Sequence, residues 1–211
     1  MKKIFIFVCK CVAVYAALFL SAYLFGKSWN GIWATLPTYL YFGLGILLMA
    51  LFIRFFAGRT YSFLQVFTHE LIHGVFVFLT QGKIVSFYAD QKQGEIWSTS
   101  NNIFMSLAPY CVPIYTFVLL LIKPLILSEY MWILDLLIGM TFAFHLHTIW
   151  IQTGTHQTDI VRYSWAISYP LIITMGCISL YITFVGMRIG FLGACWQFLK
   201  QAWNVLVQIV S

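Results

Sequence analysis

The sequence predicts an all-α polytopic membrane protein of about six transmembrane helices, with a short membrane-associated β-hairpin and a C-terminal amphipathic helix. Hydrophobic residues make up 62% of its 211 residues and charged residues only 9%, whereas soluble domains average about 45–50% apolar and about 25% charged residues. Apolar runs of about 20 residues, the length that crosses a bilayer, recur along the chain. Little sequence remains for extramembrane mass, so residues 1–211 are predicted to form a single integral membrane domain.

Apolar segments separated by short polar stretches account for the predicted spans. The first follows Met1-Lys2-Lys3 and is longer than the roughly 7–15 apolar residues of a signal peptide, so it is interpreted as a retained span. Pro109 and Pro113 are expected to bend the fourth segment. The predicted segments are Ile4–Phe25, Ile32–Phe56, Tyr61–Thr80, Ile103–Ile126, Met131–Gln152 and Ser164–Met187.

Two stretches depart from the pattern of membrane spans. Residues 83–98 are too polar to cross a bilayer, and they alternate around a turn-like segment, residues 90–94, which predicts a short hairpin. In residues 190–211, polar side chains recur every three or four positions against an apolar side. This pattern predicts an amphipathic helix that lies in the membrane interface.

Charge and cysteine content exclude some classes of protein. The net charge of +6 is expected from Lys and Arg residues that flank membrane spans, so no nucleic-acid partner is predicted. The cysteines are odd in number and lie mostly within apolar runs. They are therefore predicted to be buried, reduced thiols rather than a disulfide framework.

The third apolar segment contains His69-Glu70-Leu71-Ile72-His73, an HExxH sequence. Residues four apart share a helix face, so the two imidazoles can bind one metal ion. Glu70 points about 100° away, toward a water beside the metal, which suits a catalytic general base. Ionisable side chains in hydrocarbon are costly and indicate a functional site. The sequence therefore predicts a Zn²⁺ site at His69 and His73.

A catalytic zinc ion usually takes three protein ligands and leaves one position open, so another residue must complete the set. Asp159 is ranked first, because it precedes the sixth segment at the membrane side where the third segment ends. An alternative role for it is a helix N-terminal acid paired with Arg162. The competing ligands are His145, His147 and His156.

Other polar residues are candidates for supporting roles. His145 and His147 are two residues apart and diverge on a helix, so they are expected to line the cavity or support the metal ligands. Satisfied buried histidines are an equally open interpretation. Asn101 and Asn102 could donate hydrogen bonds to a developing oxyanion, or they could cap the fourth helix.

The stretch HELIHGVFVFLTQGKIVSF, which begins at His69, resembles the site-2 protease family of intramembrane zinc metalloproteases. In that family a Gly follows HExxH, and a β segment, a small-residue-Pro helix and an Asp at a later helix start come after it. Here Gly74, residues 83–98, Ala108-Pro109 and Thr158-Asp159 take those places. The likeness covers residues 61–169, and Ile160 in place of the family's Gly indicates a divergent branch.

The resemblance implies His69 and His73 as zinc ligands, Glu70 as catalytic base and Asp159 as third ligand, within a catalytic core of about residues 61–170. It further implies an endopeptidase that cleaves a transmembrane protein or peptide substrate in the lipid bilayer, with the cell (plasma) membrane as the expected location. No substrate-recognition domain is visible, so an adaptor protein is expected to supply selection.

Alternative functions remain open at the level of sequence. One is a zinc-binding membrane protein without catalysis, or a transporter. A second is a haem protein that uses His73 with His145 or His147, although this leaves Glu70 unexplained. A third is a membrane-anchored metalloprotease that acts on soluble peptides.

Overall fold

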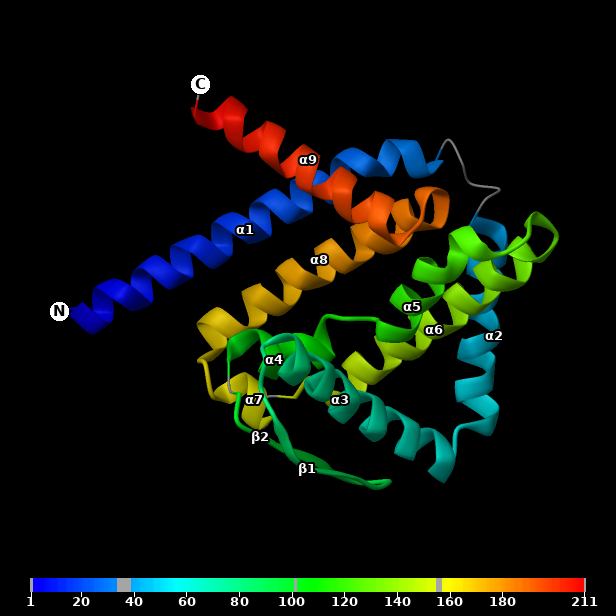
Figure 1. The fold of residues 1–211 in the computed structure, drawn as a ribbon, viewed down its shortest axis with the longest axis horizontal. Coiled ribbons are helices and arrows are strands. Elements are labelled where there is room, and N and C mark those ends of the chain that lie inside the picture. Colours follow the sequence, from blue (N-terminus) through cyan, green and yellow to red (C-terminus); the bar gives the residue numbers. More distant parts are fainter. Residues whose placement is uncertain (1, 34–38, 101, 155–156, 211) are drawn as a thin grey trace.

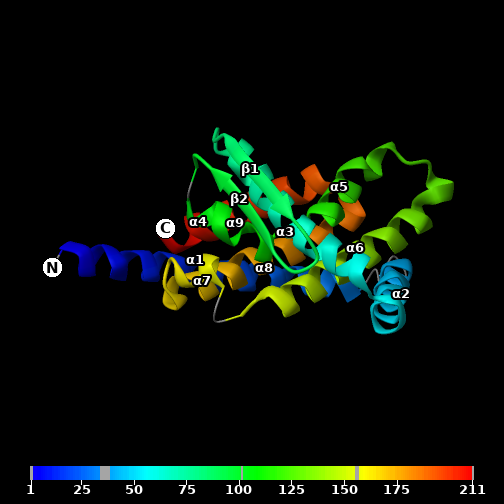
Figure 2. The ribbon, with the colours of Figure 1, turned by 90° about the horizontal axis from the view of Figure 1, so that it is seen from below.

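The computed structural model describes residues 2–33, 39–100, 102–154 and 157–210, which form a mostly helical assembly with one two-stranded sheet (Figure 1). The long helices α1 and α8 run side by side, and the sheet lies beside α3 (Figures 1 and 2). In chain order the elements are α1 (Lys2–Trp33), α2 (Leu40–Phe56), α3 (Arg59–Leu79), β1 (Ile84–Ala89), β2 (Gly94–Ser98), α4 (Ile103–Leu107), α5 (Ile114–Ile122), α6 (Met131–Gln152), α7 (Thr158–Val161), α8 (Trp165–Ile189) and α9 (Phe191–Val210), with 3₁₀ turns at Ala108–Tyr110, Lys123–Leu125 and Ser128–Tyr130.

The predicted apolar segments are largely helical, but not every one is a single helix or a simple span. The predicted boundary between the first two segments is wrong, because α1 continues to Trp33 and the described helix of the second segment is α2. Four described helices are long and apolar enough to cross a membrane, namely α1, α3, α6 and α8. The predicted fourth span is a pair of helical pieces that meet at 83°, because Pro109 and Pro113 lack the N–H that a continuous helix needs. α2 is apolar but has only 17 residues. The mostly helical architecture is confirmed, with four candidate spans among the described residues, or five if the bent pair crosses as one, whereas six are not shown.

Helices α2 and α6 approach each other closely at two glycines. A Cβ on Gly45 would lie 2.0 Å from the backbone oxygen of Leu136, and one on Gly139 would lie 2.0 Å from that of Phe42. Small residues permit such contact between helix backbones, which supplies packing energy where lipid provides no hydrophobic driving force. The pair forms one wall of the bundle, and α6 carries the residues that reach the site described below.

We expect Gly45→Ala to destabilise the protein, because the added methyl group must push two backbones apart. Overpacking of this kind costs about 1–3 kcal/mol, which should lower the thermal unfolding midpoint measured in detergent. Gly43→Ala is the matched control on the same helix, since a Cβ there meets nothing within 4 Å. Ala also has a higher helix propensity than Gly. Equal midpoints for the two variants would contradict the close approach.

The predicted hairpin is confirmed, with β1 and β2 paired antiparallel. The hairpin directly follows α3. This helix ends in a hydrogen-bonded C-terminal motif, in which Gly82 N–H donates to Val77 O at 2.8 Å and Gln81 N–H donates to Phe78 O at 3.0 Å. The residue in the left-handed conformation is Gln81, with φ of 58°, whereas glycine is the usual residue in this conformation at a helix C-terminus. Gly82 is required for space instead, since a Cβ there would lie 2.5 Å from that of Ser100.

Asp90 organises the turn of the hairpin. Its carboxylate accepts hydrogen bonds from the backbone N–H of Lys92 at 2.6 Å and of Gln93 at 2.8 Å, and from the Tyr88 hydroxyl at 2.7 Å. The Lys92 N–H, followed by the Tyr88 hydroxyl and the Gln93 N–H, holds the pKa of Asp90 below its ordinary value. The turn residues 91–94 are thereby held over the metal-binding face of α3.

Helix α9 occupies most of the predicted amphipathic segment, residues 190–211, and begins after Gly190, whose φ of +78° permits the turn out of α8. Ala194 is fully buried against α8 and α1. Leu192, Trp196 and Trp203 form an exposed apolar stripe, at 70%, 70% and 67% exposure. The helix is confirmed, and its position in the membrane interface stays a prediction.

A buried ion pair joins the end of the bent span to α6, between Lys123 Nζ and Asp135 Oδ1. A charge removed from water needs such a partner, so Asp135 is a structural acid here.

The cysteines are free, as predicted, although only Cys111 is fully buried.

Candidate metal centre

Helix α3 brings His69 and His73 together on one face. The centroids of their rings are 4.8 Å apart, as expected for side chains one helical turn apart. Both residues are largely buried, with 9% and 4% of their surface exposed. The two rings therefore share a face of the helix, as the spacing predicts.

Asp159 reaches these rings from α7, the short helix between α6 and α8. Its Oδ2 lies 3.6 Å from His69 Nε2 and 3.4 Å from His73 Nε2. One ligand atom from each of the three residues lies within 4.8 Å of the others. Among the described residues, the ionic contacts of Asp159 are with the imidazoles and none is with Arg162. The carboxylate thus arrives from a separate short helix and not from the start of α8.

The outer nitrogens of both imidazoles are held by hydrogen-bond acceptors. His69 Nδ1 lies 2.8 Å from Gln152 Oε1 on α6, and His73 Nδ1 lies 2.8 Å from the backbone oxygen of Met105 on α4. A carbonyl oxygen only accepts hydrogen bonds, so Nδ1 carries the proton in each ring. Each Nε2 then has a free lone pair directed toward Asp159, which is the tautomer that a metal ligand requires.

This arrangement places three electron-rich atoms around a common point. Two imidazole lone pairs and a carboxylate oxygen repel each other unless a positive charge lies between them, either a proton on a ring or a metal ion. Burial raises the pKa of Asp159, but a positive charge on the neighbouring His69 or His73 ring lowers it by more, so the pKa lies below its ordinary value. The group is therefore a carboxylate at neutral pH and is suited to binding a cation.

Glu70 lies beside the three candidate ligands and is not one of them. It is 6% exposed, and it borders a cavity of about 500 Å³ between α3, the hairpin turn and the end of α6. A Cβ on Gly94 would lie 2.5 Å from Glu70 Cγ, so the turn fits over the carboxylate only because residue 94 is a glycine. The polar side chains that line this cavity include Ser62, Gln65, Gln91, Gln93, Gln152 and Gln157.

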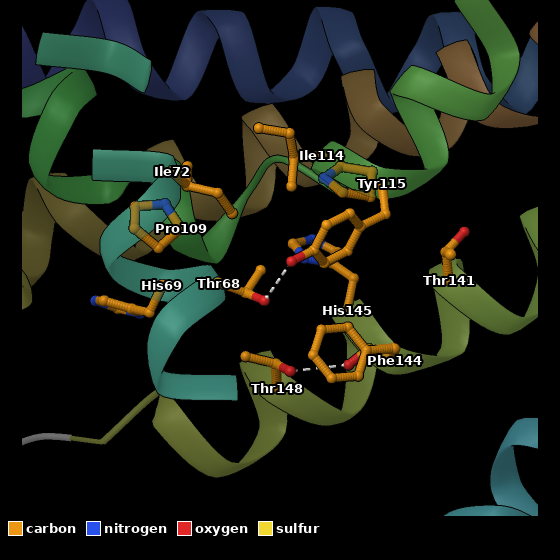
Figure 3. Close-up of a pocket in the computed structure, with 11 residues that line it drawn as sticks. Thr68, His69, Ile72, Pro109, Ile114, Tyr115, Thr141, Phe144, His145 and Thr148 are labelled. Carbon is orange, nitrogen blue, oxygen red and sulfur yellow. Dashed lines mark hydrogen bonds between the residues drawn. The ribbon is translucent and has the colours of Figure 1, made fainter. Parts of the chain in front are cut away.

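His145 belongs to α6 and faces a side of α3 other than the one that Asp159 approaches. It lines a cavity of about 10 Å³ with His69, Thr68, Tyr115 and Thr148 (Figure 3), which is room for about one water molecule. In Figure 3 the His69 ring points away from this cavity. The Thr68 hydroxyl is hydrogen-bonded to that of Tyr115 at 3.0 Å. The structure therefore does not bring His145 to the group formed by His69, His73 and Asp159.

The remaining predicted residues are not gathered at this group in the described part of the chain. His147 Nδ1 lies 2.7 Å from the Tyr61 hydroxyl and 3.3 Å from Gln65 Nε2, near the start of α3. Asn102 caps α4, where its Oδ1 accepts a hydrogen bond from Met105 N–H at 2.8 Å, which matches the capping alternative. Asn101 and His156 lie outside the described residues.

Several residues of the site carry no recognisable signal in the sequence. Gln152 is one of many polar residues at a helix end, and Met105 contributes only a backbone oxygen. Gly94 looks like an ordinary turn glycine. Tyr110 lies in the proline-containing stretch of the sequence, yet its ring packs against that of His69, with centroids 5.3 Å apart. Their spacing in the sequence predicts none of these contacts, because each joins separate elements.

Comparison of the chain with protein-family models, with curated proteins and with solved structures gave no match. The chemistry of the site therefore has to be argued from its own residues.

Proposed function

We propose that this protein is a zinc-dependent intramembrane endopeptidase that cleaves membrane-embedded protein or peptide substrates. The observation that carries the proposal is the meeting of His69, His73 and Asp159 beside Glu70, on and next to a helix of membrane-spanning length. Imidazole and carboxylate groups at such a depth are costly unless they serve a bound ion or a reaction. A buried acid that is not a ligand supplies the base that a purely structural metal site does not need.

The donor set fits zinc in chemistry and in spacing. Zinc binds His nitrogen and Asp oxygen at about 2.0–2.2 Å, so adjacent ligands of a tetrahedral site lie roughly 3.3–3.5 Å apart. The separations of 3.4 Å and 3.6 Å between Asp159 Oδ2 and the two Nε2 atoms are close to this value. Outer-sphere acceptors on both Nδ1 atoms are also typical of zinc-binding histidines.

Each residue around the ion has a defined role in this mechanism. A bound zinc ion polarises the substrate carbonyl and makes a coordinated water more acidic. Glu70 accepts a proton as water attacks the carbonyl carbon, and then delivers a proton to the departing amine nitrogen. Gln152 and the Met105 carbonyl hold the two imidazoles in orientation. The polar cavity beside Glu70 gives water and substrate access to the reacting atoms.

The remaining parts of the proposal concern the substrate and the membrane. A transmembrane helix hides its peptide bonds in internal hydrogen bonds, so the substrate must unwind before it is cut. The β1–β2 hairpin beside α3 offers a strand edge with which the unwound segment can pair. We further propose that α2 and the bent pair complete a six-span domain in the plasma membrane, and that an adaptor protein selects substrates.

The alternatives are separated by specific features of the site. A non-catalytic zinc protein or a transporter shares the three ligands and differs in having no use for Glu70. A haem bridge between His73 and His145 lacks space, since the cavity beside His145 measures about 10 Å³. A purified protein with a haem absorption band would favour that alternative. A protease of soluble peptides would cleave β-casein in solution but spare a peptide embedded in liposomes.

Metal removal tests the proposal directly. We expect the purified protein to hold about one zinc per chain and to cleave a quenched fluorescent peptide with one apolar segment of about 20 residues in liposomes. Treatment with 1,10-phenanthroline should abolish cleavage, and added Zn²⁺ should restore it. Circular dichroism of the metal-free protein controls for unfolding. Undiminished cleavage by metal-free protein would refute a zinc-dependent reaction.

A further inference from the structure

Tyr110 has a buried hydroxyl group that no structural hydrogen bond explains. It ends the 3₁₀ turn Ala108–Tyr110 that joins α4 to α5, and only 1% of its surface is exposed. Among the described residues its hydroxyl has no hydrogen-bond partner. Burying such a group without a partner is unfavourable, so phenylalanine would serve better if the side chain only filled space.

The location of Tyr110 indicates which partner the hydroxyl serves. Its ring packs against the His69 imidazole, with centroids 5.3 Å apart and planes at 80°. The carboxylates of Asp159 and Glu70 are both close enough to the phenol to act on it electrostatically. The phenol therefore packs on the His69 side of the metal-binding face of α3, within electrostatic reach of the candidate third ligand and the candidate base.

A second buried tyrosine shows that an unpartnered hydroxyl alone is insufficient evidence. Tyr181 on α8 is fully buried, and its hydroxyl also lacks a hydrogen-bond partner in the described part of the chain. Its ring packs against Phe198 on α9, with centroids 5.3 Å apart, within an apolar cluster. Tyr110 differs because its ring packs against a candidate metal ligand, His69, and not within an apolar cluster alone.

We infer that Tyr110 is a catalytic hydrogen-bond donor that stabilises the oxygen of the scissile carbonyl as that oxygen gains negative charge. This inference rests on the proposed peptidase function. As water adds to the carbonyl carbon, a C–O bond forms and the π electrons of the carbonyl move to its oxygen. The Tyr110 O–H donates a hydrogen bond to this oxygen and keeps its proton. The C–N bond then breaks, and Glu70 transfers the proton taken from water to the amine.

A donor of this kind acts more strongly on the transition state than on the substrate. Preorganised donors in a site of low dielectric stabilise developing charge without the cost of reorienting solvent. The turn that carries Tyr110 contains Pro109 and lies against α3, and the His69 ring limits movement of the phenol. The hydroxyl is thus held in place before substrate binds, which explains why it has no partner in the protein alone.

Tyr110→Phe tests the inference, with Tyr181→Phe as the matched control. Removing one oxyanion donor typically lowers kcat by about 10²–10³-fold, and we expect such a loss for Tyr110→Phe in the liposome peptide assay. Its affinity for a phosphinate peptide, which carries a charged tetrahedral oxygen, should fall in parallel. Zinc content and the thermal midpoint of metal-free protein should not fall, because the variant removes only an unpaired hydroxyl. Tyr181→Phe should match wild type in cleavage, phosphinate affinity and zinc content, and its thermal midpoint should not fall.

The outcomes distinguish this inference from the proposed function. Cleavage and phosphinate affinity of Tyr110→Phe equal to wild type would overturn the inference and leave the peptidase function standing. Loss of zinc or of the folded state in Tyr110→Phe would show a structural role and would also overturn it. Wild-type protein that holds zinc but does not cleave would refute the peptidase function itself, and the inference with it.

Discussion

Glu70→Gln is expected to abolish peptide cleavage while zinc stays bound. The amide keeps the size of the carboxylate but cannot accept a proton from the attacking water, and general base catalysis contributes about 10²–10⁴-fold to a rate. The ligand atoms of His69, His73 and Asp159 are unchanged, since Glu70 is not one of the three grouped donors. Cleavage in liposomes and zinc content by mass spectrometry, measured on the same preparation, check both halves of the expectation.

The control for this variant is an acid of similar size away from the site. Glu129 lies in the 3₁₀ turn before α6 and is not buried, so Glu129→Gln should keep both zinc and activity. Full activity in Glu70→Gln would mean that another group serves as the base. A wild-type protein that binds zinc, with neither variant changing anything measurable, would support the non-catalytic alternative.

Asp159→Ala is expected to cause the largest loss of zinc affinity caused by any single change outside α3. Removal of a ligand atom leaves two neutral imidazoles, which provide no charge to balance the divalent ion. The effect should exceed the roughly 10–100-fold loss that follows removal of a supporting partner. Gln152→Ala, which removes the acceptor from His69 Nδ1, provides that smaller comparison. Competition for zinc with a chelator of known affinity measures both variants.

His69→Ala and His73→Ala should lose zinc to at least the same extent as Asp159→Ala. Glu129→Ala serves as the unaffected control, because its side chain takes part in no described contact with the site. Retention of full zinc occupancy in Asp159→Ala would exclude it as the third ligand. The assignment would then pass to a histidine, with His145 and His156 as the residues to replace next.

Local patterns in the sequence predict most of the secondary structure. Helix lengths follow from the long apolar runs, and Met131–Gln152 has the same bounds in the sequence prediction and in the structure. The hairpin follows from alternation around residues 90–94. The shared face of His69 and His73 follows from helical periodicity alone, because both residues belong to one element.

The sequence predicts contacts between two separate helices less completely. The sequence indicates that prolines bend the fourth segment, but only the structure gives the angle of 83° between its two halves. It expects Asp159 at or ahead of the sixth span, whereas the structure places this residue on a separate short helix. The sequence predicts His145 and His147 near the metal ligands. In the structure His147 contacts Tyr61, and His145 lines a small cavity with Thr68.

Taken by itself, the sequence predicts the membrane class, the succession of helices and the pairing of two imidazoles with an acid on one helix, because each depends on neighbours within a few residues. The tertiary structure alone brings Asp159 within 3.6 Å of His69, orients both rings through Gln152 and the Met105 carbonyl, and places the unpaired hydroxyl of Tyr110 among them. These contacts join helices that are far apart in the chain. Their distances are set by how the helices pack, and no local periodicity records that packing.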